Sequence, residues 1–210
     1  IDGAERITQA RDRVLVGMHW GPGISILKLL KSHGMKPLLV YRQVEPSIMG
    51  SRPFYYFFLK KAVRYITDTC GDRAVPVRGA SNALRKHLPE PGTSIVVLDA
   101  PPVPGRSTIA GKVLDWPVLF NAGFPELLRE SGKQHQFYTI SLKPGSKALK
   151  ILEVAEPRPA GSTEALVGDY CDYLGQHIEQ DSAQWRIWQV ADQFFQEREM
   201  KKDDSAVEAP

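Results

Sequence analysis

A single histidine stands where an apolar run gives way to small, turn-forming residues. The run of residues 14–18 ends at His19, and a helical pattern begins at Ile24 after the turn residues 20–23. In open α/β folds, the residues that follow a parallel strand lie at the rim of the sheet, where ligands bind. The start of a helix disfavours a protonated imidazole, so a neutral His19 is suited to act as a general base. The alternative is a loop histidine that only makes hydrogen bonds.

A histidine base works best with a carboxylate that accepts its second ring N–H, because this contact fixes the tautomer and stabilises the imidazolium. Asp99 follows the apolar run of residues 94–98, and we expect it at the same rim of the sheet as His19, where a solvated loop charge or a helix cap is the alternative to a catalytic role. A solvated loop charge or a helix cap is the favoured interpretation of three other candidates: Glu45, Asp68 and Asp72.

Apolar runs alternate with helical patterns along the chain, which predicts an α/β fold with a mainly parallel sheet flanked by helices. Strands are expected at residues 14–18, 37–41, 74–77, 94–98, 138–142 and 148–154, and helices at 24–32, 54–66, 81–88 and 124–131. A long helix is expected after its N-cap, Ser162, followed by a second helix in which Trp185 and Trp188 serve packing. We therefore expect a single domain over residues 1–198, with a C-terminal helical segment at 162–197 and a flexible tail at 199–210.

Composition and charge argue against several classes of protein. The 210 residues are 42% hydrophobic and 24% charged, and no run approaches the roughly 20 apolar residues of a membrane-spanning helix. The net charge of +3 is too small to indicate a nucleic-acid partner. Metal-ligand spacings and glycine-rich nucleotide motifs are missing, so neither a metal nor a cofactor is predicted. Because the chain begins at Ile1 rather than at methionine, we expect further residues upstream.

Five successive aromatic residues, 54–58, carry a second signal. They cannot all face one core from a helix, so several must be exposed beside Lys60, Lys61 and Arg64. Exposed aromatic and basic side chains suit an anionic membrane interface, or an acyl chain that enters between lipid and protein. The alternative is a helix that is packed on two sides.

The order of these segments resembles the lysophospholipid acyltransferase superfamily, and within it the branch of lipid A lauroyl/myristoyl acyltransferases. The likeness runs from about residue 7 to residue 188. It is carried by the strand and histidine of residues 14–21, by Tyr41-Arg42 at a strand end, by residues 80–99 and 138–156, and by the closing stretch of residues 178–188. The family motif places Asp or Glu after His and four further residues. Ile24 occupies that acidic position here.

The resemblance implies an acyltransferase that moves a fatty acyl group from an acyl carrier protein or coenzyme A thioester to a hydroxyl of a lipid or glycolipid acceptor. It would work at the cytoplasmic face of the bacterial inner membrane, in peripheral contact or through a segment missing from this chain. The alternative is a non-catalytic relative that binds lipid or acyl carrier protein and has lost the catalytic pair. Ile24 favours this alternative.

The same resemblance assigns roles to particular residues. His19 would be the general base, and Asp99 or water would replace the missing acid. Backbone N–H groups of residues 21–23 would lie near the developing oxyanion. The expected substrate contacts are Trp20, Gly21, Gly23, Arg42 and Arg78, the two arginines as anion contacts.

Overall fold

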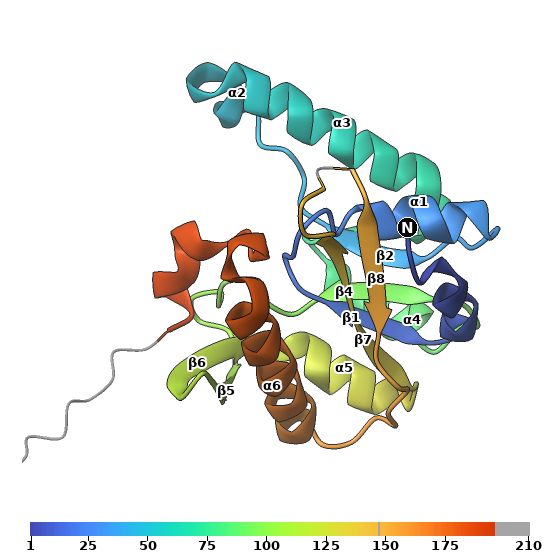
Figure 1. Ribbon diagram of the computed structural model, residues 1–210, viewed down its shortest axis with the longest axis vertical. Helices are drawn as coiled ribbons and strands as arrows, with labels where there is room; N and C mark the ends of the chain where they lie inside the picture. The colour runs from blue at the N-terminus through green and yellow to red at the C-terminus, as the bar shows by residue number, and fades with distance from the viewer. Residues whose placement is uncertain (147, 196–210) are drawn as a thin grey trace, which may run out of the picture.

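Six strands form one sheet in the computed structural model, which describes residues 1–146 and 148–195. Their order is β3-β2-β4-β1-β7-β8, and Figure 1 shows helices on both faces of this sheet. The strands are β1 (Val14–Gly17), β2 (Leu38–Tyr41), β3 (Ala74–Pro76), β4 (Ser94–Val97), β7 (His135–Leu142) and β8 (Lys150–Val154). All neighbouring strands pair in parallel except β7 and β8, so the expected α/β fold with a mainly parallel sheet is confirmed.

Two layers of helices cover the sheet. The elements on one face are the 3-10 helix η1 (Ala4–Ala10), α1 (Ser25–Ser32) and α3 (Pro53–Cys70), and those on the other are α4 (Ala80–His87), α5 (Gly123–Ser131) and α6 (Thr163–Asp181). A short helix α2 (Ser47–Ser51) precedes α3, and a 3-10 turn η2 (Gly71–Arg73) follows it. The side chain of Ser162 accepts the Ala165 N–H at 3.1 Å, which confirms the expected N-cap of α6.

The central strand β1 joins two hydrophobic cores. Successive side chains of a strand point to opposite faces. Val14 and Val16 therefore pack into the core beneath α4, α5 and α6, whereas Leu15 packs into the core beneath α1 and α3. All four residues of β1 are buried, as expected for a parallel strand that is covered on both sides.

An antiparallel hairpin, β5 (Thr108–Val113) and β6 (Trp116–Asn121), lies outside the main sheet, and sequence patterning did not predict it. Its turn residues, Leu114 and Asp115, have φ values of 51° and 65°, and leucine, unlike aspartate, is rare in this conformation. Gly111 lets the hairpin pack against α6, because a Cβ at this position would lie 2.5 Å from Cys171 Sγ.

The C-terminal segment differs from its expected form. In place of a second long helix, α6 is followed by two 3-10 helices, η3 (Ser182–Gln184) and η4 (Trp188–Gln193). This irregular path brings Trp185, between the two turns, back over the carboxyl edge of the sheet at β1. The predicted tail, residues 199–210, lies outside the described residues.

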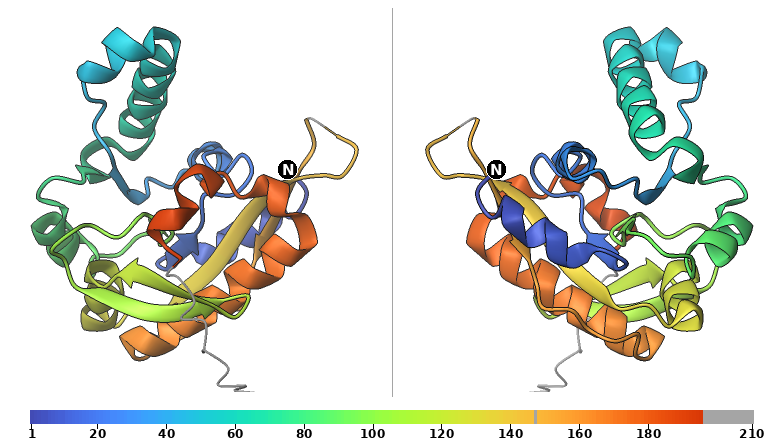
Figure 2. Two further views of the ribbon diagram at one scale, coloured as in Figure 1. Left: turned by 90° about the vertical axis from the view of Figure 1, so that its left-hand side faces the viewer. Right: turned by 90° about the vertical axis from the view of Figure 1, so that its right-hand side faces the viewer.

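The helix α3 extends well beyond the sheet. Figures 1 and 2 show α2 and the first turns of α3 projecting from the body of the molecule. Of the described side chains of α3, those classed as buried are Thr69 and Cys70, both at its C-terminal end. The projecting half therefore presents most of its surface to the surroundings.

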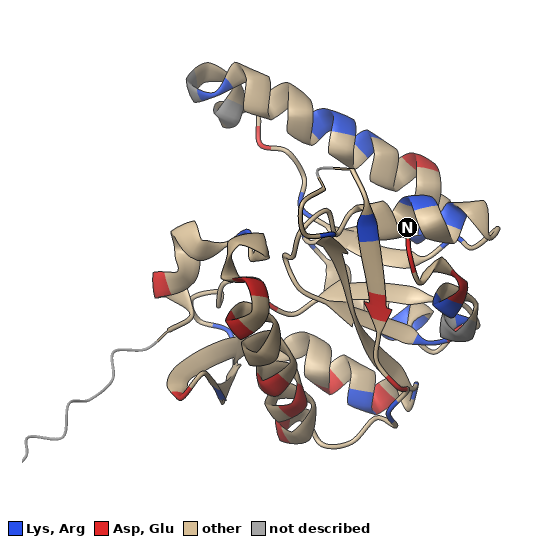
Figure 3. Cartoon of the chain, viewed as in Figure 1, with Lys and Arg blue, Asp and Glu red and all other residues tan. Residues whose placement is uncertain are grey.

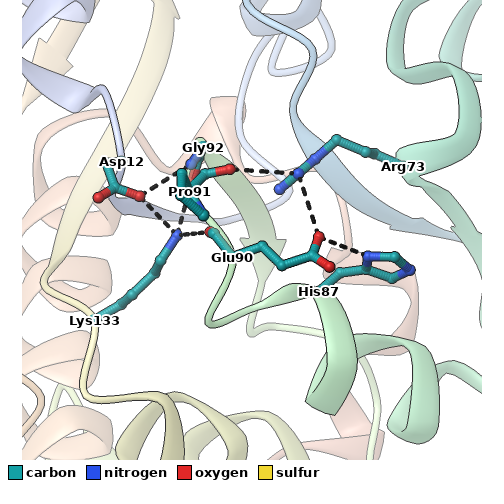
Figure 4. A network of polar contacts seen from close by, with 7 residues as sticks. All are labelled: Asp12, Arg73, His87, Glu90, Pro91, Gly92 and Lys133. Atoms are coloured by element: carbon teal, nitrogen blue, oxygen red, sulfur yellow. Dashed lines mark hydrogen bonds and ion pairs between the residues drawn. The ribbon is translucent and has the colours of Figure 1, made fainter.

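A polar cluster closes the amino edge of the sheet, opposite His19 (Figure 4). The nearly buried Lys133 lies with its Nζ 2.9 Å from Asp12 Oδ1, and it donates to the carbonyl oxygens of Glu90 and Gly92. Asp12 also accepts the Gly92 N–H at 3.0 Å. Lys133 therefore connects Asp12, two positions before β1, to the segment that leads into β4.

Replacing Lys133 by methionine is expected to lower the free energy of unfolding by about 2 kcal/mol, because two carbonyl groups and a carboxylate lose a charged donor. Lys133 also lowers the pKa of Asp12, so this stabilisation is present above the ordinary carboxyl pKa and is lost as the pH falls through the lowered one. Urea unfolding at neutral and acid pH measures both effects. The matched control Lys36→Met removes an exposed cation and should change stability little. Equal losses in the two variants would contradict the role of Lys133.

Candidate active site

Neighbouring strands bring His19 and Asp99 together at the carboxyl edge of the sheet. β1 and β4 pair in parallel with Gly17 opposite Val97, and each of the two polar residues stands two positions beyond its strand end. His19 Nδ1 lies 2.9 Å from Asp99 Oδ1. The expectation that both residues share one rim is confirmed.

Asp99 is fully buried, yet donors surround its carboxylate. The backbone N–H of His19 donates to Oδ1 at 3.0 Å and to Oδ2 at 2.8 Å, and the indole N–H of Trp185 donates to Oδ2 at 2.8 Å. Hydrogen bonds of this kind stabilise the charged form of a carboxylate. An ionised Asp99 only accepts hydrogen bonds, so the proton of the neutral imidazole sits on Nδ1. The second ring nitrogen, Nε2, is then free to accept a proton from a ligand.

The surroundings of His19 adjust its basicity in two opposing directions. Burial lowers the pKa of the imidazole, but the hydrogen bond that the ring donates to Asp99 and the negative charge of Asp99 raise it by more, and the net result is a pKa above the usual value. The side chain remains 45% exposed. His19 is therefore both accessible to a ligand and more basic than an ordinary histidine.

His19 forms part of the wall of a cavity of about 810 Å³. The cavity extends between the loop after β1, the end of β2, α1 and the inward side of α3. Most of its lining is apolar, and among the described residues that line it there is no carboxylate. Its size lies within the range of small-molecule sites. The apolar residues that line it from α1, α3 and the sheet include Ile26, Leu27, Leu39, Leu59, Val63, Ile66 and Ile95.

The C-terminal segment completes the site from the far end of the sequence. Trp20 and Trp185 form an isolated antiparallel bridge, in which the Gly21 N–H donates to Gln184 O at 2.8 Å and the Arg186 N–H donates to His19 O at 2.7 Å. The guanidinium of Arg186 donates through Nε to Gly21 O and lines the cavity. Sequence reasoning assigned Trp185 to packing and gave Arg186 no role. The signal that pointed to both was their place in the closing stretch of the family resemblance.

The loop residues 20–23 are held tightly by contacts within the protein. Besides the Gly21 N–H, the Gly23 N–H is engaged with Trp20 O at 3.0 Å, and Pro22 has no N–H to offer. Trp20 lines the cavity, but its indole N–H donates to Ser141 Oγ at 2.9 Å. Gly21 has a φ of 42°, and a Cβ there would lie 2.5 Å from Ile140 O. In this structure the N–H groups expected to face an oxyanion instead fix the shape of the loop.

The other predicted residues lie apart from the histidine pair. Arg42 lines the cavity but is exposed and pairs with Glu45, its Nη2 lying 3.1 Å from Oε1. Arg78 follows β3 as an exposed residue and is not part of the cavity wall.

Two of the alternative acids are also placed elsewhere. Asp68 lies near Arg64 on α3, with 3.8 Å between Oδ2 and Nε. Asp72 lies in η2, ahead of β3 and so at the amino side of the sheet. Asp99 is therefore the carboxylate that contacts His19 among the four considered.

Comparison with models of known protein families finds no match to this chain, and neither does comparison with curated proteins. Within residues 1–146 and 148–195, no helix combines the length and the apolar character needed to cross a bilayer. The same residues hold no cluster of three or more His, Cys, Asp or Glu suited to a metal ion. The fold and the site define an α/β protein with a histidine–aspartate pair at the edge of an apolar cavity.

Proposed function

We propose that this protein is an acyltransferase that moves a fatty acyl group from an acyl carrier protein or coenzyme A thioester to a hydroxyl of a lipid or glycolipid acceptor. The observation that carries the proposal is the position of His19. Its Nδ1 is held by the buried Asp99, and its ring lies on the wall of a cavity lined by hydrocarbon side chains. A proton acceptor beside an apolar cavity is what the transfer of a long acyl chain to an alcohol requires.

The reaction follows from the ring geometry. His19 Nε2 accepts the proton of the acceptor hydroxyl as the oxygen attacks the thioester carbonyl carbon. The carbon–sulfur bond of the tetrahedral intermediate then breaks, and the departing sulfur takes the proton from the imidazolium. Asp99 remains ionised throughout, holds the ring in one tautomer and stabilises its protonated form. The acceptor hydroxyl becomes an ester, and the donor leaves as a free thiol.

The surface of α3 supports a site of action at an anionic membrane. Phe54 is 90% exposed, and three of its aromatic neighbours, Tyr55, Phe57 and Phe58, are also exposed, as predicted. Lys60, Lys61 and Arg64 follow on the same helix, and Figure 3 shows their positive charges along it. Tyr55 and Phe58 also line the cavity. On this proposal α3 lies on the cytoplasmic face of the bacterial inner membrane, and lipid chains enter the cavity beside it.

Charge reversal on α3 tests this membrane contact. The double variant Lys60→Glu/Lys61→Glu is expected to reduce binding to vesicles that contain phosphatidylglycerol by at least about tenfold, because each lysine near an anionic surface contributes about 1 kcal/mol. Sedimentation with vesicles measures the bound fraction. The control Lys86→Glu/Lys112→Glu makes the same charge change on α4 and β5, at two exposed positions outside α3. Wild-type protein that stays in the supernatant, or equal losses in the two variants, would contradict the contact.

A second candidate is a non-catalytic protein that binds an acyl chain or an acyl carrier protein. Ile24 favours it, because this residue stands at the acidic position of the family motif and lines the cavity, 49% exposed. The engaged N–H groups of Gly21 and Gly23 favour it as well, because they leave the oxyanion fewer donors.

Release of free thiol from acyl thioesters, measured with and without an alcohol acceptor, separates the candidates. A transferase releases thiol in step with the formation of the acyl ester. A binding protein takes up the chain and releases no thiol. Thiol release that does not depend on the acceptor would instead indicate hydrolysis.

A further inference from the structure

Arg186 is the cation that the fold holds at the His19 end of the cavity. Its backbone N–H donates to His19 O at 2.7 Å, and its Nε donates to Gly21 O. Both contacts join the C-terminal segment to the loop that carries the histidine. The side chain lines the cavity together with His19. Arg186 is an exposed residue, but these two contacts hold it beside the base.

The charges around the cavity are unbalanced at this end. The two arginines that line it are Arg42 and Arg186, and the residues described in its wall include no carboxylate. Arg42 pairs with Glu45 at 3.1 Å, whereas the ion pairs among the described residues include none to Arg186, whose Nε donates to Gly21 O. Besides the arginines, the polar side chains of the wall include His19 and three tyrosines, and none of these is a carboxylate. Arg186 thus leaves one positive charge without a counter-charge beside an otherwise apolar space.

Several of the backbone donors near His19 are already engaged within the protein. The N–H groups of Gly21 and Gly23 are engaged with Gln184 O and Trp20 O, and the first N–H groups of α1 are engaged with Pro22 O and Gly23 O. The buried carboxylate of Asp99 lies behind the imidazole, and its hydrogen bonds to His19 and Trp185 occupy both oxygens. An anion that enters this end of the cavity therefore meets the guanidinium as its principal charged donor. A guanidinium matches the geometry of carboxylate and phosphate oxygens.

We propose that Arg186 is an anion-binding residue, which gives the cavity a preference for single-chain amphiphiles with a carboxylate or phosphate head group. The hydrocarbon chain occupies the apolar space between α1, α3 and the sheet, and the head group lies between Arg186 and His19. This inference rests on the proposed function in one respect, since it takes the cavity to be the site of the acyl chain. It adds that the ligand also carries a negatively charged group at the His19 end of the cavity.

Binding of three ligands that share one chain length tests the inference without any catalytic assay. Calorimetric titration with decanoate, decyl phosphate and decanol is carried out well above the carboxylic pKa and below the concentrations at which the chains aggregate. The wild-type protein is expected to bind at least one of the two anions about tenfold more tightly than decanol, as one charge-assisted contact provides. Tighter binding of decyl phosphate would point to the phosphate of an acceptor, and tighter binding of decanoate to a fatty acid head group.

Substitution of Arg186 supplies the decisive comparison. Arg186→Gln should bind anions and decanol equally, while Arg186→Lys should retain part of the preference. Unchanged binding of decanol in both variants verifies that the cavity is intact. The matched control Lys28→Gln removes an exposed cation of α1 that does not line the cavity, and it should keep the full preference.

Two results would overturn the inference. One is equal affinity of the wild-type protein for decanoate, decyl phosphate and decanol, and the other is an anion preference that survives in Arg186→Gln. Thioester turnover by the same preparation would then show that the proposed function stands while the role of Arg186 fails. If none of the three ligands binds, both the inference and the assignment of the cavity to an acyl chain are wrong.

Discussion

Replacing His19 by alanine is expected to lower the rate of acyl transfer by about two to four orders of magnitude, the usual contribution of a positioned general base. The acceptor hydroxyl then loses the group that takes its proton during attack on the thioester. The cavity loses one partly exposed side chain and keeps its apolar wall, so binding of the acyl chain should change little. The effect should therefore appear in kcat far more than in KM.

The fold should survive this change. Asp99 keeps the His19 backbone N–H and the Trp185 indole N–H as donors when the ring is removed. Thiol release in the presence of an alcohol acceptor measures turnover, and urea unfolding measures stability. His33→Ala is the matched control, because the ring of His33 bonds to Leu29 O at the end of α1 and lies outside the cavity. Transfer at the wild-type rate by His19→Ala would contradict the mechanism.

The shared rim of His19 and Asp99 could be predicted from local patterns, although the two residues are 80 positions apart. Two short apolar runs, each followed by a polar residue, identify two strand ends, and parallel strands end at the same edge of a sheet. The exposed aromatic face of α3 was predictable for a similar reason. A helix cannot turn five successive residues toward one core, whatever lies around it.

The contacts that complete the site depend on distant parts of the chain. Trp185 and Asp99 are separated by 86 positions, and Arg186 and Gly21 by 165. A pattern within a window of sequence carries no information about such a pair. Both contacts depend on the irregular path of η3 and η4. No helical periodicity in the sequence predicts that path. The hairpin of β5 and β6 was not predicted because its turn includes Leu114, which adopts a left-handed conformation that leucine does not signal.

The position of Asp99 also bears on Ile24, which stands at the acidic position of the motif that this sequence resembles. A carboxylate at the family position would stand at the start of α1, in the wall of the cavity. Here Asp99 reaches the imidazole from β4, beneath the loop, and Ile24 adds apolar surface to the cavity instead. A carboxylate at position 24 and the carboxylate of Asp99 would each accept the N–H of the His19 ring, but from different directions. If the proposed function holds, Asp99 takes the role that the motif acid has in the family this sequence resembles.

Replacing Asp99 by asparagine is expected to lower turnover by up to about four orders of magnitude, because an amide can no longer stabilise the imidazolium and can hold the ring in the wrong tautomer. The carboxylate accepts hydrogen bonds from the His19 backbone N–H and from the Trp185 indole N–H, and in the variant the amide nitrogen would face one of these two donors. A loss of stability should accompany the loss of activity. Asp68→Asn, which changes an exposed carboxylate on α3, is the matched control and should leave both unaltered.

The pH dependence of transfer separates the chemical role of Asp99 from a structural one. Activity requires a neutral imidazole, so it falls as the pH drops through the pKa of His19, which Asp99 raises. Without that charge the pKa falls, and the acid limb of the Asp99→Asn profile should move to lower pH even though its maximum is reduced. Trp185→Phe keeps the charge but removes one donor, so its acid limb should stay near that of the wild type, with a loss of about tenfold. A silent Asp99→Asn beside an inactive His19→Ala would mean that backbone groups or water set the tautomer.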